Sequence, residues 1–297
     1  MESGQTVHPI TPTTNFFVIN RYSGPPFDID KWRLLVDGCV STPLTLSYET
    51  LTTSYSRVSE VITMECVINP VGGHLVGTAV WSGVPLQELL DDAAIYDTAI
   101  ELLCTSADGL NRGFPLKYFK HPLTMLAYEM NGQRLLPNYG FPLRLVVPGY
   151  YGFVWRKWLL NLSLTDQSYQ DPQWLASMKT VKSKRVMLST KILIPRDNEK
   201  IQTSPHTIMG VSWGSGSPIQ DVEVSLDEGQ SWTSAEIIWR ASHPDAWVLW
   251  KLSWEPQKRQ TYTVTARAID TSGQMQLNGV DTYPSGFGAW HKVQIQT

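Results

Sequence analysis

The sequence predicts an α+β protein with two domains, a mixed α/β domain followed by an antiparallel β-sandwich. The length of 297 residues exceeds the usual size of one compact core. The first half mixes apolar runs of strand length with one clear amphipathic helix. From residue 207 onward, short segments alternate apolar and polar residues between frequent turns, which is typical of a sandwich of about 90–120 residues. We therefore place the domains at residues 1–180 and 181–297.

The elements of the first domain follow from local patterns. Strands are predicted for the apolar runs 31–40, 57–66, 100–106 and 143–147. Residues 44–51 predict a helical turn. Residues 84–94 predict a helix, because Pro85 suits the first helical position and apolar residues then fall on one face. The Asn131-Gly132 pair between apolar runs predicts a hairpin turn.

The second domain begins after a more polar segment, residues 175–206, with a local basic cluster, which we interpret as a crossing between domains. Alternation of period two predicts strands with one apolar face around Val222 and Val264. A turn is predicted at residues 227–229 between the first of these strands and its return. Gly210 to Gly214 matches the nucleophile-elbow pattern, but no helix is expected to follow it, so we attribute the match to chance.

Composition excludes several classes of function. The 24 Lys and Arg against 27 Asp and Glu give a net charge of -3, which argues against nucleic acid as a partner. No apolar run approaches the ~20 residues of a membrane span. The first fifteen residues lack the features of a signal peptide, so we expect a cytoplasmic protein, with a trimmed exported protein as the alternative. The six His form no zinc-hydrolase motif, and phosphate-binding glycine motifs are missing.

Three cysteines cannot form a disulfide framework, so each is considered as a thiol. Cys66 lies where a predicted strand enters a loop rich in Asn, Pro and Gly, the kind of place where a reacting thiol is displayed. The alternative is a buried structural cysteine. Cys39 and Cys104 lie in apolar runs without special neighbours, so we expect both to be packing residues.

A second candidate region surrounds an apolar strand. Arg144 precedes the strand, and Arg156 and Lys157 follow a glycine turn after it. Cations at both ends of a strand are able to clamp a phosphate, for which Arg offers a bidentate fork. From spacing alone, ordinary strand-end charges in solvent are the better supported alternative.

These stretches, in order, resemble the molybdenum-cofactor domain of the sulfite oxidase family, which includes assimilatory nitrate reductases. The matching segments of the first half are residues 16–21, 63–66, 81–86, 126–133 and 140–158. Those that resemble the family's dimerisation domain are residues 210–213, 222–232, 247–250 and 266–270. The resemblance implies a sulfite-oxidase-like fold with an immunoglobulin-like second domain and a homodimer. Aromatic residues such as Trp239, Trp247, Trp250 and Trp254 would serve that interface, or else fill the sandwich core.

The resemblance also implies a cofactor, Mo-molybdopterin with a single pterin. Cys66 stands at the position of the thiolate that binds molybdenum, and a soft sulfur suits this metal. Residues at the family's cofactor contacts are Phe17, Val18, Asn20, Arg21, Asp108, Tyr139, Arg144, Arg156 and Lys157. Arg144 and Lys157 match the family in type and are the strongest candidates for the pterin phosphate. Tyr139 stands where the family often has His.

Departures from the family concern the substrate. Ile19 replaces an Arg that helps to hold sulfite, and Arg21 stands at a His position. Pro70 and Val71 replace a basic pair after the Cys loop, and no Tyr occurs between residues 171 and 182, where the family has an active-site Tyr. Loss of cations weakens binding of a doubly charged oxyanion, so we expect a substrate less anionic than sulfite. Arg21 and His74 remain as catalytic candidates; the alternative for His74 is a solvated loop residue.

The resemblance thus implies two-electron oxygen-atom transfer on a small molecule. The sequence has no His-Pro-Gly-Gly motif, so we expect no haem and a separate electron-transfer partner such as a cytochrome. Two alternatives remain open at this point: an oxide or sulfoxide reductase on the same cofactor, and a non-catalytic binding protein that keeps the fold.

Overall fold

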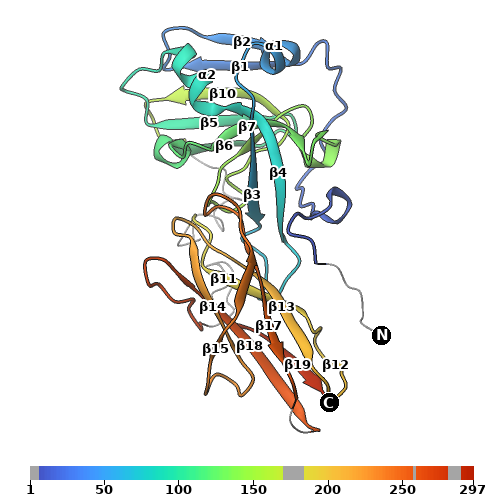
Figure 1. Cartoon of the computed structure of the whole chain (residues 1–297). Helices are drawn as coiled ribbons and strands as arrows, with labels where there is room; N and C mark the ends of the chain where they lie inside the picture. The colour runs from blue at the N-terminus through green and yellow to red at the C-terminus, as the bar shows by residue number, and fades with distance from the viewer. Residues whose placement is uncertain (1–6, 170–183, 257–258, 280–288) are drawn as a thin grey trace. The chain divides into compact units, whose positions relative to one another are not determined.

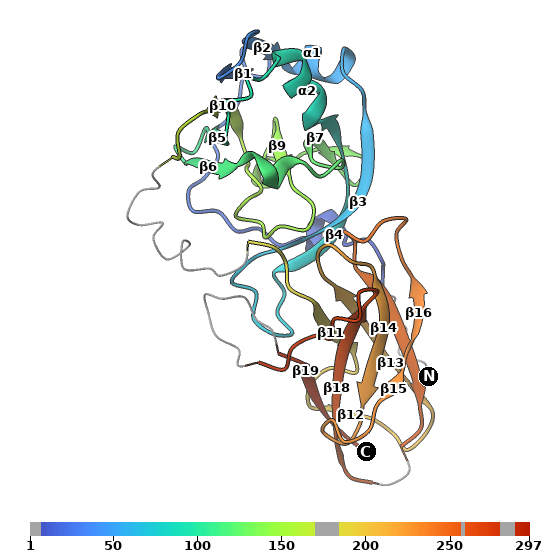
Figure 2. The same cartoon turned by 90° about the vertical axis from the view of Figure 1, so that its left-hand side faces the viewer.

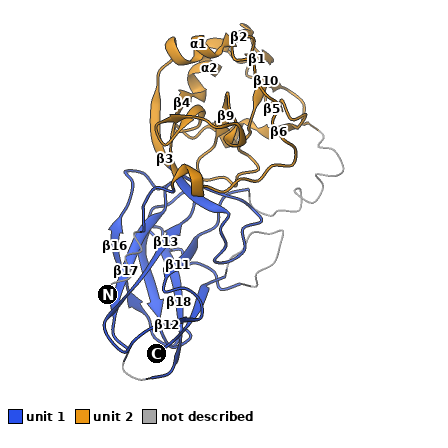
Figure 3. Cartoon of the chain, turned by 90° about the vertical axis from the view of Figure 1, so that its right-hand side faces the viewer, with its two compact units in different colours: residues 1–11, 62–78, 181–297 blue, residues 12–61, 79–180 orange. Residues whose placement is uncertain are grey.

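The chain forms two compact units, which are described separately (Figure 3). The computed structural model describes residues 7–169, 184–256, 259–279 and 289–297. We call residues 1–11, 62–78 and 181–297 the sandwich unit, and residues 12–61 and 79–180 the mixed unit. The sequence predicts a division at residue 180, and the structure groups two segments from before that point, 1–11 and 62–78, with the residues after it. The loop that carries Cys66 therefore belongs to the sandwich unit.

One sheet of the mixed unit has the strand order β2-β1-β10-β5-β6 (Figure 1). Its strands are β1 (Arg33–Gly38), β2 (Leu44–Ser47), β5 (Glu101–Ser106), β6 (Asn111–Pro115) and β10 (Leu159–Thr165). The β1–β10 pair is parallel, and the other pairs are antiparallel. The predictions of strands at 31–40 and 100–106 are confirmed.

A further sheet has the order β3-β4-β7-β8, with β9 also paired to β7. Its strands are β3 (Val58–Glu65), β4 (Val76–Pro85), β7 (Met125–Met130), β8 (Gln133–Arg134) and β9 (Arg144–Val146). The β7–β8 turn has positive φ at both Asn131 (54°) and Gly132 (75°), as the predicted Asn-Gly hairpin requires. The C-terminal end of β3 and the first residues of β4 lie in the sandwich unit, so these two strands flank the Cys66 loop.

Helices are short in the described residues, and the fold is mostly sheet. They are α1 (Tyr48–Thr53), α2 (Leu86–Ala93) and the 3-10 helices η1 (Thr13–Asn15), η2 (Leu116–Phe119) and η3 (Pro137–Tyr139). The predicted helix at 84–94 is confirmed as α2, with Pro85 as its N-cap. The helical turn predicted at 44–51 is wrong in its first half. Ser47 ends β2 and caps α1 by accepting a hydrogen bond from Thr50 N, so the helix begins only at Tyr48.

The sandwich unit packs two sheets around one apolar core (Figure 2). The first sheet contains β11 (Ser189–Ile194), β13 (His206–Trp213), β17 (Val248–Trp254) and β16 (Glu236–Trp239), in this order. The second contains β12 (Glu199–Lys200), β19 (His291–Gln296), β18 (Thr261–Asp270), β14 (Ile219–Ser225) and β15 (Thr233–Ser234). The predicted sandwich is confirmed, while its immunoglobulin-like topology stays a prediction.

The core of the sandwich explains the alternating pattern. Val222 and Val224 of β14 and Val264 of β18 are fully buried, and Trp250 of β17 lies among them. Trp250 is therefore a core residue and not an interface residue. Of the segment expected to cross between the domains, residues 189–194 and 199–200 form strands of this unit, and residues 175–183 lie outside the described residues. No helix in the described parts of the chain is long and apolar enough to cross a membrane.

Candidate functional site

The Cys66 loop runs from the end of β3 at Glu65 to the start of β4 at Val76, and backbone hydrogen bonds close it. Cys66 N donates to Leu75 O (2.9 Å), which joins the two ends of the loop. Asn69 N donates to Cys66 O (2.9 Å), which forms a tight turn after the cysteine. Burial raises the pKa of the Cys66 thiol, against a smaller lowering by the backbone N–H of Ile68. The free thiol is therefore protonated at neutral pH, and a bound metal would deprotonate it.

A buried carboxyl group, that of Glu65, forms hydrogen bonds that hold this loop in place. Glu65 is 6% exposed. Its Oε1 accepts from Asn69 Nδ2 and its Oε2 accepts from the indole Nε1 of Trp213 in β13, both at 2.9 Å. The amide oxygen of Asn69 in turn accepts from Leu75 N (2.9 Å). Burial raises the pKa of Glu65 to about 7. The Glu65 side chain thus links the end of β3 to Asn69 in the loop and to Trp213 in β13.

A second anchor holds the far side of the loop. Lys191 Nζ of β11 donates to Gly73 O (2.7 Å) and lies 3.4 Å from His74 Nδ1, and burial lowers the lysine pKa. The His291 ring of β19 packs on Gly72, where φ is +70° and a Cβ atom would lie 2.1 Å from His291 Nε2. Only glycine fits this position. His74 itself is exposed, at the rim of the loop.

The mixed unit holds a cluster of three cations. Arg144 is 2% exposed, and its guanidinium lies over the rings of Trp81 (4.7 Å) and Trp155 (5.6 Å). Its Nη1 donates to Tyr139 O (3.0 Å), and burial lowers its pKa to about 9. Arg156 Nη2 donates to Ser106 Oγ and Leu110 O, both at 3.1 Å. Both guanidinium groups are buried, so desolvation of their charges has to be offset by contacts such as these.

Lys157 completes the cluster. Its Nζ donates to Ile19 O (3.1 Å), to Asn138 O (3.2 Å) and to Asn20 Oδ1. Its pKa falls to about 7, first through burial and then through the charges of Arg144 and Arg156, while Asp108 raises it. Three cations and one carboxylate leave an excess of positive charge, which a bound phosphate would relieve. The residues present therefore fit an anionic group.

The segment 16–21 contacts this cluster through its backbone, because Ile19 O accepts a hydrogen bond from Lys157 Nζ. The Tyr139 hydroxyl donates to the carbonyl oxygens of Thr13 (2.6 Å) and Phe16 (2.8 Å), so it fixes the start of this segment. Phe17 stacks on Phe16, with ring centroids 5.3 Å apart. Val18 and Ile19 are 39% and 46% exposed, and Arg21 is exposed next to Tyr22.

The structure brings together part of the predicted site. Four predicted residues meet around the ammonium of the fifth, Lys157, through a hydrogen bond or charge: Asn20, Asp108, Arg144 and Arg156. Val18 and Arg21 point to the surface. Cys66 and His74 belong to the other unit, where they share one loop. The expected position of the family's Tyr, between residues 171 and 182, lies outside the described residues.

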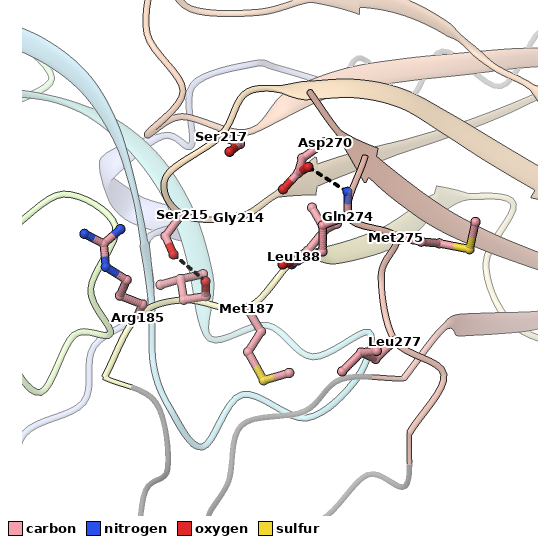
Figure 4. Close-up of a pocket in the computed structure, with 11 residues that line it drawn as sticks. Arg185, Met187, Leu188, Gly214, Ser215, Ser217, Asp270, Gln274, Met275 and Leu277 are labelled. Carbon is pink, nitrogen blue, oxygen red and sulfur yellow. Dashed lines mark hydrogen bonds between the residues drawn. The ribbon is translucent and has the colours of Figure 1, made fainter. Parts of the chain in front are cut away.

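A separate pocket of about 270 Å³ in the sandwich unit contains none of the predicted site residues (Figure 4). Its polar groups serve the local fold. Ser215 Oγ donates to Val186 O, and Asp270 Oδ1 accepts from Gln274 N and Ser272 Oγ within one turn. Arg185 and Ser217 also line the pocket, next to the apolar side chains of Met187, Met275 and Leu277. This pocket offers no reactive constellation.

Comparison with known proteins identifies the family. Residues 22–174 match the model of the oxidoreductase molybdopterin binding domain, and residues 182–297 match that of the Mo-co oxidoreductase dimerisation domain. The chain belongs to the sulfite oxidase family of molybdopterin-binding oxidoreductases. The cofactor of this family is Mo-molybdopterin, as the resemblance in sequence implied.

Individual relatives agree with this assignment. The chain is 28% identical to the mitochondrial sulfite oxidases of Rattus norvegicus, over 97% of its length, and Homo sapiens, over 96%. It spans about 61% of the length of each of these proteins. The NADH nitrate reductase of Petunia hybrida is 26% identical over 83% of the chain and 34% of that protein. The sulfane dehydrogenase SoxCD of Paracoccus pantotrophus has the same fold, with a TM-score of 0.85, 23% identity and coverage of 98% of this chain and 82% of that one.

Sequence reasoning missed the residues that hold the Cys loop in this family member. They are Glu65, Asn69, Lys191, Trp213 and His291. The nearest signal was a Glu directly before the Cys and an Asn four residues after that Glu. Lys191, Trp213 and His291 lie more than 100 residues along the chain from the loop residues that they contact, and no local pattern reports such pairing.

The charge state of Lys157 predicts a pH-dependent affinity for phosphate in the metal-free protein. Because its pKa is about 7, the ammonium is present below that pH and is lost above it. Phosphate binding should therefore weaken as pH rises above 7, by up to about tenfold per pH unit. Calorimetric titration with inorganic phosphate measures this. Lys157→Met should weaken binding at low pH and flatten the dependence, whereas Lys31→Met, which removes an exposed charge from the same unit, should change neither. A pH dependence that survives in Lys157→Met contradicts the assignment.

Proposed function

We propose that the protein is an oxygen-atom-transfer enzyme that oxidises a small substrate less anionic than sulfite, with Cys66 as the protein ligand of molybdenum. The observation that carries the proposal is the Cys66 loop, which presents one thiol from a turn closed by Cys66–Leu75 and Cys66–Asn69 hydrogen bonds. The bound cofactor supplies the two-electron chemistry. Relatives that are 28% identical over nearly the whole chain carry the name sulfite oxidase, which favours oxidation over the reverse reaction.

The protein's own contribution to metal binding would be the Cys66 thiol. The thiol is partly buried, and backbone N–H groups of Val67 and Ile68 favour its anionic form. It loses its proton on coordination. Hydrogen bonds join the two ends of the loop and link it to the Glu65 carboxyl group. The sulfur would therefore keep its position, and the loop would not need to rearrange when a metal binds.

On the phosphate side, Arg144, Arg156 and Lys157 would hold the pterin's phosphate. Because these guanidinium groups are buried, a bound anion would interact with their charges in a medium of low dielectric constant, where the attraction is stronger than in water. Asn20 lies against the Lys157 ammonium and would orient it. A bound phosphate would raise the Lys157 pKa and keep the ammonium charged at neutral pH.

The substrate side is less cationic than the family pattern. Pro70 and Val71 of the Cys loop are uncharged, and Ile19 presents an apolar side chain that is nearly half exposed. Lys191 touches the loop, but its ammonium donates to Gly73 O. Exposed Arg21 and His74 remain to contact a polar substrate. This set suits a substrate with an accessible lone pair and low negative charge.

Partners follow from the same assignment. The match to the dimerisation domain supports a homodimer formed through residues 182–297. Among the aromatics expected at such an interface, Trp247 is buried and donates to Pro9 O (2.7 Å), which leaves Trp239 and Trp254 as the half-buried candidates. Electrons released by the oxidation would pass to a separate cytochrome-like partner.

The ligand assignment predicts a spectroscopic change in Cys66→Ser. Serine is a harder donor than thiolate, so the variant should lose the thiolate-to-molybdenum charge-transfer absorption of the oxidised enzyme. Protein from a host that makes molybdenum cofactor is needed, and molybdenum content is measured alongside. Cys39→Ser is the matched control and should keep the wild-type spectrum. An unchanged spectrum in Cys66→Ser contradicts the assignment.

If the substrate is less anionic than sulfite because cations are missing, a cation introduced at position 19 should strengthen the binding of an oxyanion. Ile19→Arg should strengthen inhibition by sulfate about tenfold to hundredfold, because a charged hydrogen bond to the oxyanion contributes about 1.5–3 kcal/mol. The inhibition constant is measured with artificial electron acceptors on any substrate found by screening. Ile19→Gln, which adds length and polarity without charge, is the control. Equal inhibition in both variants would show that position 19 does not face the substrate.

A further inference from the structure

Glu65 combines burial with full hydrogen bonding in an unusual position. Both carboxyl oxygens accept hydrogen bonds, from Asn69 Nδ2 and from Trp213 Nε1, and neither donor is a cation. A carboxyl group without a cationic partner is costly to bury, and an apolar residue would stabilise the same site better. Stability alone therefore does not account for a carboxyl group directly before Cys66.

The geometry gives that role. A continuous chain of hydrogen bonds runs from Trp213 through Glu65 and Asn69 to Leu75 N. Leu75 O then accepts from Cys66 N, so the hydrogen bonds return to the residue that directly follows Glu65. Every donor and acceptor in it has one assigned direction: Asn69 must give its N–H to the carboxyl and take the N–H of Leu75. The chain therefore fixes both the rotamer of Asn69 and the closure of the loop.

We propose that Glu65 is a positioning residue, which with Asn69 and Trp213 holds the Cys66 loop closed and so sets the access and orientation of the Cys66 thiol. Trp213 connects the loop to the first sheet of the same unit, because it is the last residue of β13. The inference deepens the proposed function, since it concerns the residue assigned as the metal ligand. The test of this inference does not depend on that function, because the accessibility of Cys66 is measured in metal-free protein.

The test uses variants in which hydrogen-bond donors and acceptors are exchanged between the side chains at positions 65 and 69. Glu65→Gln alone sets an amide N–H against the Asn69 amide or the Trp213 indole, so one hydrogen bond is lost in either orientation. The pair Glu65→Gln with Asn69→Asp reverses the middle bond: the glutamine amide donates to the new carboxylate, which still accepts from Leu75 N. Trp213→Phe removes the indole N–H together with part of the ring, and it leaves the Glu65 carboxyl group in place beside Cys66.

Alkylation of Cys66 by iodoacetamide, followed by peptide mass spectrometry, is the readout. Rates are taken over a pH series, and the limiting rate of the thiolate is compared, so that a change in thiol pKa is separated from a change in access. Loss of one hydrogen bond should speed the limiting rate about fivefold in Glu65→Gln and in Trp213→Phe. The double exchange should return it to within about twofold of wild type.

Controls separate loop opening from general loss of stability. Cys104 is fully buried and reports unfolding of the mixed unit, and Cys39 is a partly exposed reference in the same unit. Trp232→Phe removes an indole hydrogen bond to Gly229 O elsewhere in the sandwich and should leave Cys66 unchanged. If the limiting rate is unchanged in Glu65→Gln and Trp213→Phe, or rises equally in Trp232→Phe or in the double exchange, the positioning role is wrong. That result would leave the ligand assignment untouched, because Cys66→Ser tests it separately.

Discussion

The hydrogen bond from the Trp213 indole to the buried Glu65 carboxyl is the contact on which the site depends. Trp213 ends a central strand of the sandwich, and Glu65 ends the strand that delivers Cys66. Because both groups are buried, the bond is shielded from competing water and its loss would leave a polar atom without compensation. The sandwich unit matches the model of a dimerisation domain, and in addition one of its strands is hydrogen-bonded to the residue that precedes the candidate ligand Cys66.

Electrostatics organises the mixed unit in a different way. Arg144, Arg156 and Lys157 are close enough that the arginine charges lower the lysine pKa, and Asp108 offsets them only in part. Such a cluster is destabilising by itself, since like charges are held together in a poorly solvated place. It becomes favourable when an anion binds, which is consistent with a molybdopterin-binding domain whose cofactor carries a phosphate.

Much of the fold could be predicted from local patterns, and the reasons are physical. The Asn131-Gly132 turn, the apolar face of α2 and the alternation around Val222 and Val264 each involve neighbours in sequence, so their signals are local. The start of α1 was misplaced because a serine cap decided it. The membership of residues 62–78 in the sandwich unit could not be predicted, because it depends on contacts such as Glu65–Trp213 between residues far apart in the chain.

For the site, the residue types of Cys66, Arg144 and Lys157 were visible in the sequence, but their environments were not. Tyr139 illustrates the difference, since its hydroxyl supports Thr13 and Phe16. The central claim is that Cys66 is the one protein ligand of the metal. X-ray absorption at the molybdenum edge of the purified, cofactor-loaded protein tests it most directly. The account predicts one sulfur ligand more than the pterin dithiolene supplies, and the loss of that sulfur in Cys66→Ser. The same number of sulfur ligands in both proteins would contradict it.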